Sequence, residues 1–337
     1  MLRWVDGTEP GPDGLLALAR RALALRSGQP ARRFDGKRLA AVFLNPSLRT
    51  RTSIEAACGA LGVQPLIVSP GRGAWPLAFG DGVVMDGAEA EHIRDAIAVL
   101  AQYADVLAVR AFAGLVDPEE DRRDPVMTAF AEYAPVPVVN MESALWHPLQ
   151  GLADAATWLS HLGPDLRGVP LTLTWAPHPK ALPAAVPNQV LLTAAMLGMD
   201  VTVARPDGFE LDPQVVTRAS DLAGRGGGRV RCTANRDGAF RGAKVVVAKS
   251  WSGWSGYADR QAEAARRAEL TSWCVDVDAL ATTEDAGFMH CLPIRRNVVA
   301  TDAAIDGTNS WIHEQAGHRM WTAMALLECL LEGSWTR

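Results

Sequence analysis

Short apolar runs alternate with helical segments along most of this chain, and this alternation limits the fold more than any other feature. In the first half the apolar runs are Leu39–Phe43, Leu66–Val68, Val106–Arg110 and Val136–Asn140. Runs of this length are typical of buried strands. Helical periodicity lies before and between them, at about residues 14–26, 54–61, 89–103 and 126–133. Strands that alternate with helices predict βαβ units, and therefore an α/β fold with parallel sheets flanked by helices.

The alternation stops near residues 142–150, where His147-Pro148 interrupts it, and then begins again. A chain of 337 residues is long for a single core, so the interruption predicts two domains. In the second half we expect helices at about 149–162, 188–197 and 314–332. The strands expected there are Leu171–Trp175, Val201–Ala204, Lys244–Ala248, Trp273–Val275 and Phe288–His290.

Composition excludes several classes of protein. The net charge of −5 argues against a general nucleic-acid binder. The five cysteines are widely spaced and form no Cys-x-x-Cys pair, which favours a reducing compartment and no zinc site. The N-terminus lacks a signal-peptide apolar segment, and there is no apolar run of membrane-spanning length, so we expect a cytoplasmic protein. The glycine-rich stretch 224–228 does not match a dinucleotide-binding turn.

The segment from Phe43 to Ser53 combines a strand end, a turn and a helix start. Asn45-Pro46 ends the strand, and Ser47 is a candidate cap for a helix with apolar positions Ile54, Ala57, Cys58 and Leu61. The first N–H groups of a helix attract anions, and arginine matches phosphate oxygens. The segment therefore favours a phosphate site. The alternative is a basic helix start that touches nucleic acid, which the net charge disfavours.

Three motifs resemble those of the aspartate/ornithine carbamoyltransferase family, in the family's order. They are Ser47-Leu48-Arg49-Thr50-Arg51-Thr52, His147-Pro148-Leu149-Gln150 and His290-Cys291-Leu292-Pro293. The resemblance extends over nearly the whole chain. It implies a carbamoyl-phosphate-binding domain made of residues 1–145 and 318–337, and a domain of residues 146–317 for the amine substrate. It implies no cofactor and no metal.

The resemblance also implies roles for individual residues. Ser47, Leu48, Arg49 and Thr50 would bind the phosphate, with Arg110 and Arg319, the latter at the start of the last helix, as further contacts. His147, Pro148, Leu149, Gln150, Cys291 and Leu292 would surround the carbamoyl group. Arg49, Arg110, His147, Gln150 and Cys291 are the expected catalytic residues. Cys291 is not expected to be a nucleophile, because the amine makes the attack. The Leu292–Pro293 bond is expected to be cis. The alternatives are surface arginines, a helix-capping histidine and an inert buried cysteine.

The amine-binding region departs from the ornithine pattern. The Ser-Met-Gly of ornithine enzymes is absent, and the matching stretch is Ala248–Trp254. Lys249 would repel a free α-ammonium but suits an α-carboxylate beside a neutral amide. This resembles the N-acyl-L-ornithine branch of the family, in which Glu142 would orient the δ-ammonium and Arg295 would join Lys249. By the same resemblance, Trp75 would reach the neighbouring subunit's site in a homotrimer.

Within that branch, two positions favour a succinyl group over an acetyl group. The acetyl type has a glutamate where Ala90 stands and a lysine, carboxylated in that type, where Val299 stands. Their absence would leave a pocket without negative charge. His178 would hydrogen-bond the acyl chain, and Lys180 is a candidate partner for a distal carboxylate. Acetylornithine, free ornithine or another amine, and a non-catalytic binding relative, stay open as alternatives.

Overall fold

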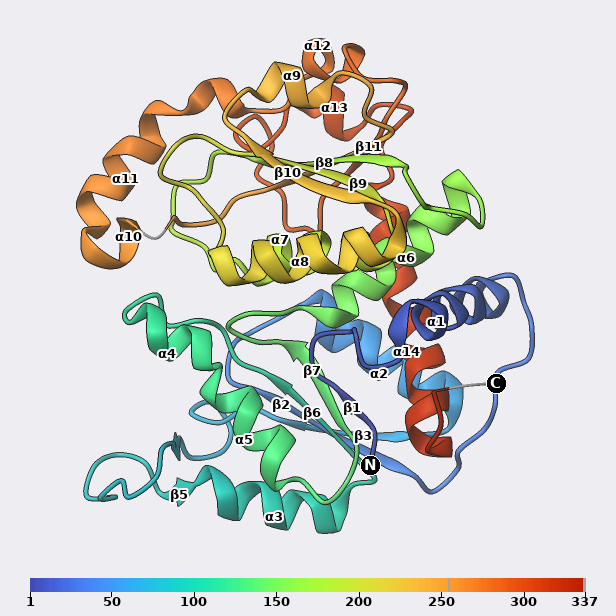
Figure 1. Ribbon diagram of the computed structural model, residues 1–337. Coiled ribbons are helices and arrows are strands. Elements are labelled where there is room, and N and C mark those ends of the chain that lie inside the picture. The colour runs from blue at the N-terminus through green and yellow to red at the C-terminus, as the bar shows by residue number, and fades with distance from the viewer. Residues whose placement is uncertain (254, 336–337) are drawn as a thin grey trace. The chain divides into compact units, whose positions relative to one another are not determined.

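The computed structural model describes residues 1–253 and 255–335 (Figure 1). The chain divides into two compact units. Unit 1 comprises Met1–Leu152 and His318–Arg337, and unit 2 comprises Ala153–Gly317. The family resemblance implies a first boundary after residue 145, whereas the units divide at residue 152, inside helix α6 (Pro148–Leu162). The last helix, α14 (Ile312–Glu332), also has residues in both units.

Unit 1 contains a five-stranded parallel sheet in the order β1-β7-β6-β2-β3. The α/β fold with parallel sheets is therefore as predicted. Leu77–Ala78 and Glu91–His92 form a separate two-stranded sheet, β4 with β5. The strands of the main sheet are β1 (Arg3–Trp4), β2 (Arg38–Phe43), β3 (Gln64–Val68), β6 (Val106–Arg110) and β7 (Val138–Glu142).

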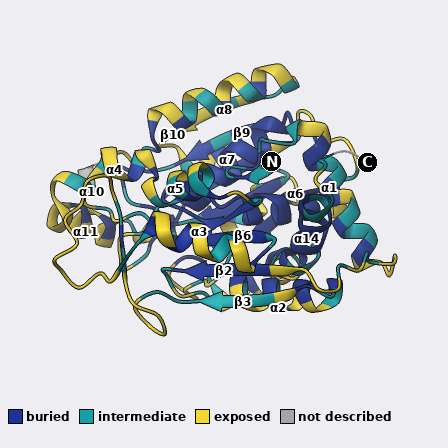
Figure 2. Cartoon of the chain, turned by 90° about the horizontal axis from the view of Figure 1, so that it is seen from below, coloured by how far each residue is buried: buried dark blue, intermediate teal, exposed yellow. Residues whose placement is uncertain are grey.

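Helices cover both faces of this sheet. On one face, α3 and α5 pack against Val42 and Val109 through an apolar cluster that includes Ile97 and Phe130. Strand side chains alternate between faces, and β2 and β6 are buried along almost their whole length (Figure 2). Figure 1 shows α1, α2 and α14 on the opposite side of the sheet from α3. The helices are α1 (Gly11–Arg26), α2 (Arg49–Leu61), α3 (Ile93–Tyr103), α4 (Pro118–Arg123) and α5 (Pro125–Tyr133).

Unit 2 has its own five-stranded parallel sheet, in the order β10-β9-β8-β11-β12. Figure 1 shows α7 and α8 on one face and α9, α12 and α13 on the other. The strands are β8 (Pro170–Trp175), β9 (Asp200–Ala204), β10 (Arg229–Thr233), β11 (Val245–Lys249) and β12 (Gly287–Met289). The helices are α7 (Ala185–Met196), α8 (Pro213–Gly226), α9 (Arg236–Phe240), α10 (Ser255–Ala258), α11 (Arg260–Glu269), α12 (Val277–Ala281) and α13 (Asp302–Ile305).

Several predicted elements differ from the structure. Helices α1 and α7 begin three residues earlier than expected, at Gly11 and Ala185. Helix α3 begins at Ile93 rather than near residue 89, because residues 91–92 pair with β4 and the His92 ring accepts a hydrogen bond from the Arg94 amide. Strand β7 begins at Val138, since Pro137 has no N–H for a strand ladder. Residues 273–275 do not form a strand: Thr271–Trp273 is a 3₁₀ turn, and Val275 makes an isolated bridge to Ala300.

No helix in the part of the chain that the structure describes is both long enough and apolar enough to cross a bilayer.

Replacement of Gly287 by alanine should destabilise unit 2. A Cβ atom at Gly287 would overlap the ring of Trp311, which stacks on His161. Overpacking of this kind costs about 1–3 kcal/mol. Gly224→Ala is the matched control, because a Cβ there meets nothing within 4 Å and alanine favours the helix. Urea unfolding of both variants is the measurement. Equal stability of the two would contradict the packing argument.

Candidate active site

Three neighbouring strands of unit 1 end at one edge of the sheet. Phe43 of β2 is the register partner of Arg110 of β6, which in turn pairs with Glu142 of β7. The loops beyond the strands are also joined, because the Leu44 amide donates to the Arg110 carbonyl and the Phe112 amide to Asn45 Oδ1, at 3.0 and 2.7 Å. The carboxyl ends of parallel strands are where open α/β sheets bind ligands.

A short turn joins β2 to α2, and the first sequence motif spans the end of this turn and the start of the helix. The helix begins at Arg49, and Leu48 occupies the cap position, one residue later than the predicted cap. Ser47 nevertheless accepts the expected hydrogen bond, from the Thr50 amide to its Oγ at 3.2 Å. Beside this turn lies a pocket of about 430 Å³, lined by Phe43, Leu44, Pro46, Ser47, Leu48, Arg51, Ser69 and Arg72. No sequence motif points to Arg72, and the sequence pattern gives Asn45 only a role in ending the strand.

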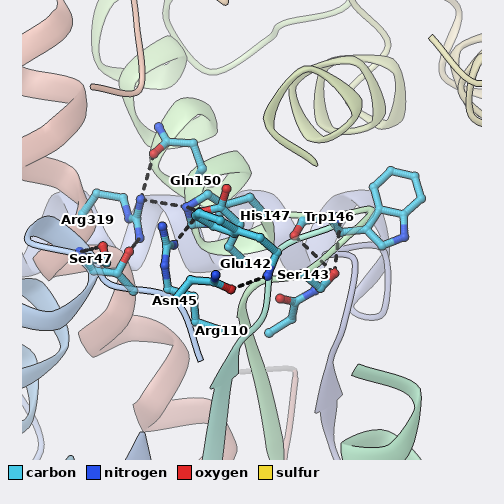
Figure 3. A network of polar contacts seen from close by, with 12 residues as sticks. Asn45, Ser47, Arg110, Glu142, Ser143, Trp146, His147, Gln150 and Arg319 are labelled. Carbon is cyan, nitrogen blue, oxygen red and sulfur yellow. Dashed lines mark hydrogen bonds and ion pairs between the residues drawn. The ribbon is translucent and has the colours of Figure 1, made fainter. Parts of the chain in front are cut away.

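Arg319 joins three segments of unit 1 that are far apart in sequence. One guanidinium nitrogen donates to Gln150 Oε1 at 2.8 Å, and the other donates to Thr50 Oγ1 at 3.2 Å (Figure 3). His147 Nε2 lies 3.4 Å from the first nitrogen. All four side chains are buried. Arg319 lies about two turns inside α14 rather than at its start, since the helix begins at Ile312.

Arg110 and Glu142 form a buried ion pair at the ends of their strands. His147 Nε2 lies 3.4 Å from the same carboxylate oxygen of Glu142 (Figure 3). The guanidinium also stands over the ring of Phe112, at 4.5 Å from its centroid. Arg110 Nε is buried and has no hydrogen-bond partner among the residues described. The Nε–H group of Arg110 can therefore donate a hydrogen bond to one more anionic oxygen.

The His-Pro-x-Gln motif forms the start of α6. Pro148 opens the helix, and the Gln150 amide donates to the His147 carbonyl at 2.8 Å. This turn directs the side chains of His147 and Gln150 toward Arg319, as Figure 3 shows. Leu149, between them, packs in the core. The motif thus supplies two polar contacts and one apolar anchor.

The His-Cys-Leu-Pro motif follows β12 in unit 2. The Leu292 amide donates to His290 Nδ1 at 2.9 Å, and the His290 amide donates to Gln315 Oε1 at 3.1 Å. The Leu292–Pro293 bond is cis, as the resemblance implies, and Leu292 has a positive φ of 55°. Cys291 is half-buried. The hydrogen bonds hold the turn with the backbone of Cys291 and Leu292 at its tip.

The predicted amine-binding residues of unit 2 lie at the ends of β8 and β11. Lys249 is the register partner of Trp175, and the Ala176 amide donates to the Lys249 carbonyl at 3.0 Å. Ser250 Oγ donates to the Ala176 carbonyl at 2.6 Å. These bonds fix the loop with His178 beside the end of β11. Trp254, at the end of the quoted stretch, lies outside the described residues.

His178 is surrounded by cationic side chains. Arg295 Nε donates to His178 Nε2 at 3.0 Å, and His178 Nδ1 lies 2.9 Å from the carbonyl and 3.0 Å from the amide of Lys180. Burial lowers the pKa of His178, and the charges of Arg295, Lys249 and Arg267 lower it further, against the hydrogen bond to Lys180. The imidazole is therefore neutral near pH 7. The side chain of Lys180 is exposed, and that of Lys249 is half-buried.

The residues predicted to select the acyl group and to reach a second subunit differ in exposure. Trp75 is 58% exposed, and its Nε1 donates to Glu91 Oε2 at 2.6 Å. Ala90 precedes Glu91 and is exposed. Val299 is buried in the apolar cluster of unit 2 that includes Val246. Its side chain packs in the core, so the case for an open acyl pocket depends on Ala90.

Two family models match the two halves of the chain. Residues 5–160 match the carbamoyl-P binding domain of aspartate/ornithine carbamoyltransferase, and residues 184–330 match its Asp/Orn binding domain.

The chain belongs to the aspartate/ornithine carbamoyltransferase family.

It is therefore a carbamoyltransferase, and the resemblance of the three motifs is confirmed.

Relatives within the family have different substrates in their names. The chain is 40% identical to the N-acetylornithine carbamoyltransferase of Xanthomonas campestris over 94% of its length and 93% of the relative's. It is 36% identical to the N-succinylornithine carbamoyltransferase of Bacteroides thetaiotaomicron, over 88% of each chain. It is 35% identical to the ornithine carbamoyltransferase of Acidothermus cellulolyticus, over 90% and 88%.

Solved structures of N-acetyl-L-ornithine transcarbamylase share the fold. One, in complex with acetylcitrulline, superposes with a TM-score of 0.95 at 39% identity and covers 98% of this chain and 99% of that one. A variant of that enzyme, in complex with carbamyl phosphate and N-succinyl-L-norvaline, has the same TM-score and identity and covers 98% and 100%.

The buried pair of Arg110 and Glu142 predicts a large effect of Glu142→Gln on stability. The neutral amide would leave the guanidinium charge uncompensated, and breaking a buried pair costs about 3–5 kcal/mol. Asp35→Asn is the matched control, since it breaks an exposed pair with Arg33, at 2.6 Å, that contributes at most about 1 kcal/mol. Urea unfolding compares the two. A loss below about 1 kcal/mol for Glu142→Gln would mean that the charge of Arg110 is compensated elsewhere.

Proposed function

We propose that the protein transfers the carbamoyl group of carbamoyl phosphate to the δ-amine of an N-acyl-L-ornithine, preferentially N-succinyl-L-ornithine. The products are an N-acyl-L-citrulline and phosphate, in arginine biosynthesis. The observation that supports this best is the buried cluster of Thr50, Arg110, His147, Gln150 and Arg319 in unit 1.

Carbamoyl phosphate matches this cluster in charge. Its dianionic phosphate would lie at the start of α2, against Ser47, Leu48, Arg49 and Thr50, where the helix dipole favours an anion. Arg319 already donates to Thr50 and Gln150, so its guanidinium is held in place before the reagent arrives. Preorganised donors of this kind stabilise developing charge without reorganisation.

In the reaction, the amine nitrogen attacks the carbonyl carbon, the bond from that carbon to the phosphate oxygen breaks, and phosphate leaves. The carbonyl oxygen gains negative charge in the transition state. His147 and Gln150 would stabilise that charge, together with the backbone and thiol edge of Cys291. The reaction changes no oxidation state, so no redox cofactor takes part.

Arg110 would exchange one anion for another when carbamoyl phosphate binds. In the structure it pairs with Glu142, and its Nε has room for a further acceptor. A dianionic phosphate attracts the guanidinium more strongly than a single carboxylate does. Glu142 would then be able to orient the δ-ammonium of the amine substrate, which must lose a proton before it attacks.

The amine-binding residues favour an acylated ornithine. Lys249 and Arg295 suit the α-carboxylate, and both charges act on neutral His178. A free α-ammonium would meet two cations there, whereas an amide would not. The N-acetylornithine and N-succinylornithine relatives, at 40% and 36% identity, support the same choice.

The residues near the proposed acyl site and the names of the relatives favour different acyl groups. Ala90 lacks the negative charge that would repel a succinyl carboxylate, and Lys180 is exposed beside His178. These favour the succinyl group. N-acetyl-L-ornithine is the second candidate, because the relatives of higher identity are named N-acetylornithine carbamoyltransferase.

We also propose a cytoplasmic homotrimer in which exposed Trp75 completes a neighbouring site.

The substrate assignment predicts an order of turnover for purified protein and carbamoyl phosphate. N-succinyl-L-ornithine should be used best, N-acetyl-L-ornithine less well, and free L-ornithine least, with citrulline-group formation as the measurement. Ala90→Glu should reverse the order of the first two, because it places a carboxylate beside the acyl group. An unchanged succinyl-to-acetyl ratio in Ala90→Glu would reject the charge argument. Turnover of free ornithine alone would reject the role of Lys249.

Lys249→Met should raise the KM for the acylornithine by about 10- to 100-fold, which is the loss of one charge-assisted hydrogen bond. The KM for carbamoyl phosphate should stay unchanged, because its proposed ligands in unit 1 are intact. Lys244→Met is the matched control at the opposite end of β11, where the lysine pairs with Glu284 at 3.5 Å. Steady-state kinetics of both variants is the measurement, and equal KM values in the two would contradict the assignment.

A further inference from the structure

A four-residue turn, Ser143 to Trp146, connects the end of β7 to the start of α6. We call it the 143–146 turn. Glu142 precedes it and His147 follows it, so its shape sets the distance between these two side chains (Figure 3). The Ser143 amide donates to the Trp146 carbonyl at 2.8 Å, and the Trp146 amide donates to Ser143 Oγ at 3.3 Å.

Asp124 binds this turn from outside it. The Ser143 hydroxyl donates to Asp124 Oδ2, and the amides of Ala144 and Leu145 point at the same carboxylate at 3.4 and 3.5 Å. Asn140 Nδ2 donates to Ser143 Oγ at 2.9 Å. The hydroxyl accepts from Asn140 and from the Trp146 amide, and of its two possible acceptors the Asp124 carboxylate is far closer than the Trp146 carbonyl, which lies at 3.5 Å.

The backbone places Asp124 for this contact. It joins α4 to α5 in the left-handed region, with a φ of 47°, and its side chain is buried. Asp121 makes a parallel contact from α4. It accepts the amides of Gly114 and Leu115 at 2.7 and 2.8 Å, in the loop that follows Arg110. Two aspartates of one short segment thus bind the loops beyond β6 and β7.

Asp124 has no ion-pair partner among the residues that the structure describes. A buried carboxylate is costly unless it is hydrogen-bonded, and its bonds here come from a hydroxyl and backbone amides. Burial raises the pKa of Asp124 to about 6, although the hydrogen bonds from Ser143 and from the amides of Ala144, Leu145 and Met127 lower it. The carboxylate form, which can accept all these bonds, therefore prevails at neutral pH.

We propose that Asp124 is a positioning residue for carbamoyl transfer: through Ser143 it fixes the 143–146 turn, and thereby the placement of Glu142 and His147. The proposal rests on the proposed reaction at this site but not on the acyl group. A displacement of about 1 Å at catalytic side chains can slow a reaction by about 100-fold. Loss of the contact should therefore lower kcat.

Asp124→Asn and Ser143→Ala, alone and combined, test the proposal. In Asp124→Asn the new side-chain amide has the shape of the carboxylate, but its NH₂ would face either the hydroxyl proton or a backbone amide, so it cannot accept both bonds. Ser143→Ala removes the hydroxyl alone. The matched control is Glu328→Gln, which removes another buried carboxylate of unit 1. Glu328 accepts from Arg21 and from the Arg32 amide, nine residues along α14 from Arg319.

We expect each of the two single variants to lose kcat by about 10- to 100-fold, with the KM for the amine within threefold of wild type. The double variant should lose no more than the larger single loss, because both changes break one link. Glu328→Gln should keep the wild-type kcat even if urea unfolding shows it less stable. The amine is whichever one the wild-type enzyme uses best, so a wrong acyl assignment appears in the wild-type rates and does not affect this comparison.

Three results would overturn the proposal. One is a kcat of Asp124→Asn within twofold of wild type. Another is multiplicative loss in the double variant. The third is a loss of kcat in Glu328→Gln equal to that in Asp124→Asn, which would show a general effect of stability. If Asp124→Asn does not fold, Ser143→Ala decides alone, and a wild-type kcat there rejects the role of Asp124.

Discussion

Arg110 and Glu142 end neighbouring parallel strands, and their side chains meet where neither charge would be stable alone. Removing such charges from water costs several kcal/mol for each ion, and only a close opposite charge offsets it. The parallel register supplies that closeness, because strands that run in one direction end at one edge. The rest of the unit 1 site is built around the pair. His147 approaches the carboxylate, and Arg319 uses the neutral partners Thr50 and Gln150.

In unit 2, polar side chains also gather where parallel strands end, but their balance of charge is different. The ends of β8 and β11 place His178 and Lys249 next to each other, and Arg295 joins them through a hydrogen bond. Arg267 pairs with Glu263, whereas Arg295 and Lys249 have no carboxylate partner among the residues that the structure describes. Burial lowers the pKa of His178, and these charges lower it further, so the imidazole stays neutral. Such a cluster favours an anion from outside. In unit 1 the charges of Arg110 and Glu142 thus compensate each other before a ligand binds, whereas in unit 2 the charges of Lys249 and Arg295 would be compensated by the ligand.

The sequence predicts the strands that are apolar throughout and the motifs that follow them, because both depend on local patterns. The predictions at β2, β6 and β11 agree with the structure to within one residue at each end. The sequence does not predict the pairing of Arg110 with Glu142, since 32 residues separate them. Trp273–Val275 is predicted as a strand from its apolar residues, but Val275 has only one bridge partner. Helix α4 has a charged sequence, Pro-Glu-Glu-Asp-Arg-Arg, with no apolar stripe to indicate a helix.

Asp124 and Ser143 belong to separate segments of the sequence, so no local sequence pattern indicates their contact. On the side of the turn, the group that makes this contact is an uncharged hydroxyl. The Ser143 hydroxyl lies against the Asp124 carboxylate, so a cationic side chain at position 143 would form an ion pair there and add a charge close to the site. A hydroxyl transmits the position of Asp124 to the turn without adding a charge there. The uncharged link thus fixes the geometry and leaves the balance of charge around Arg110 to Glu142 and to the ligand.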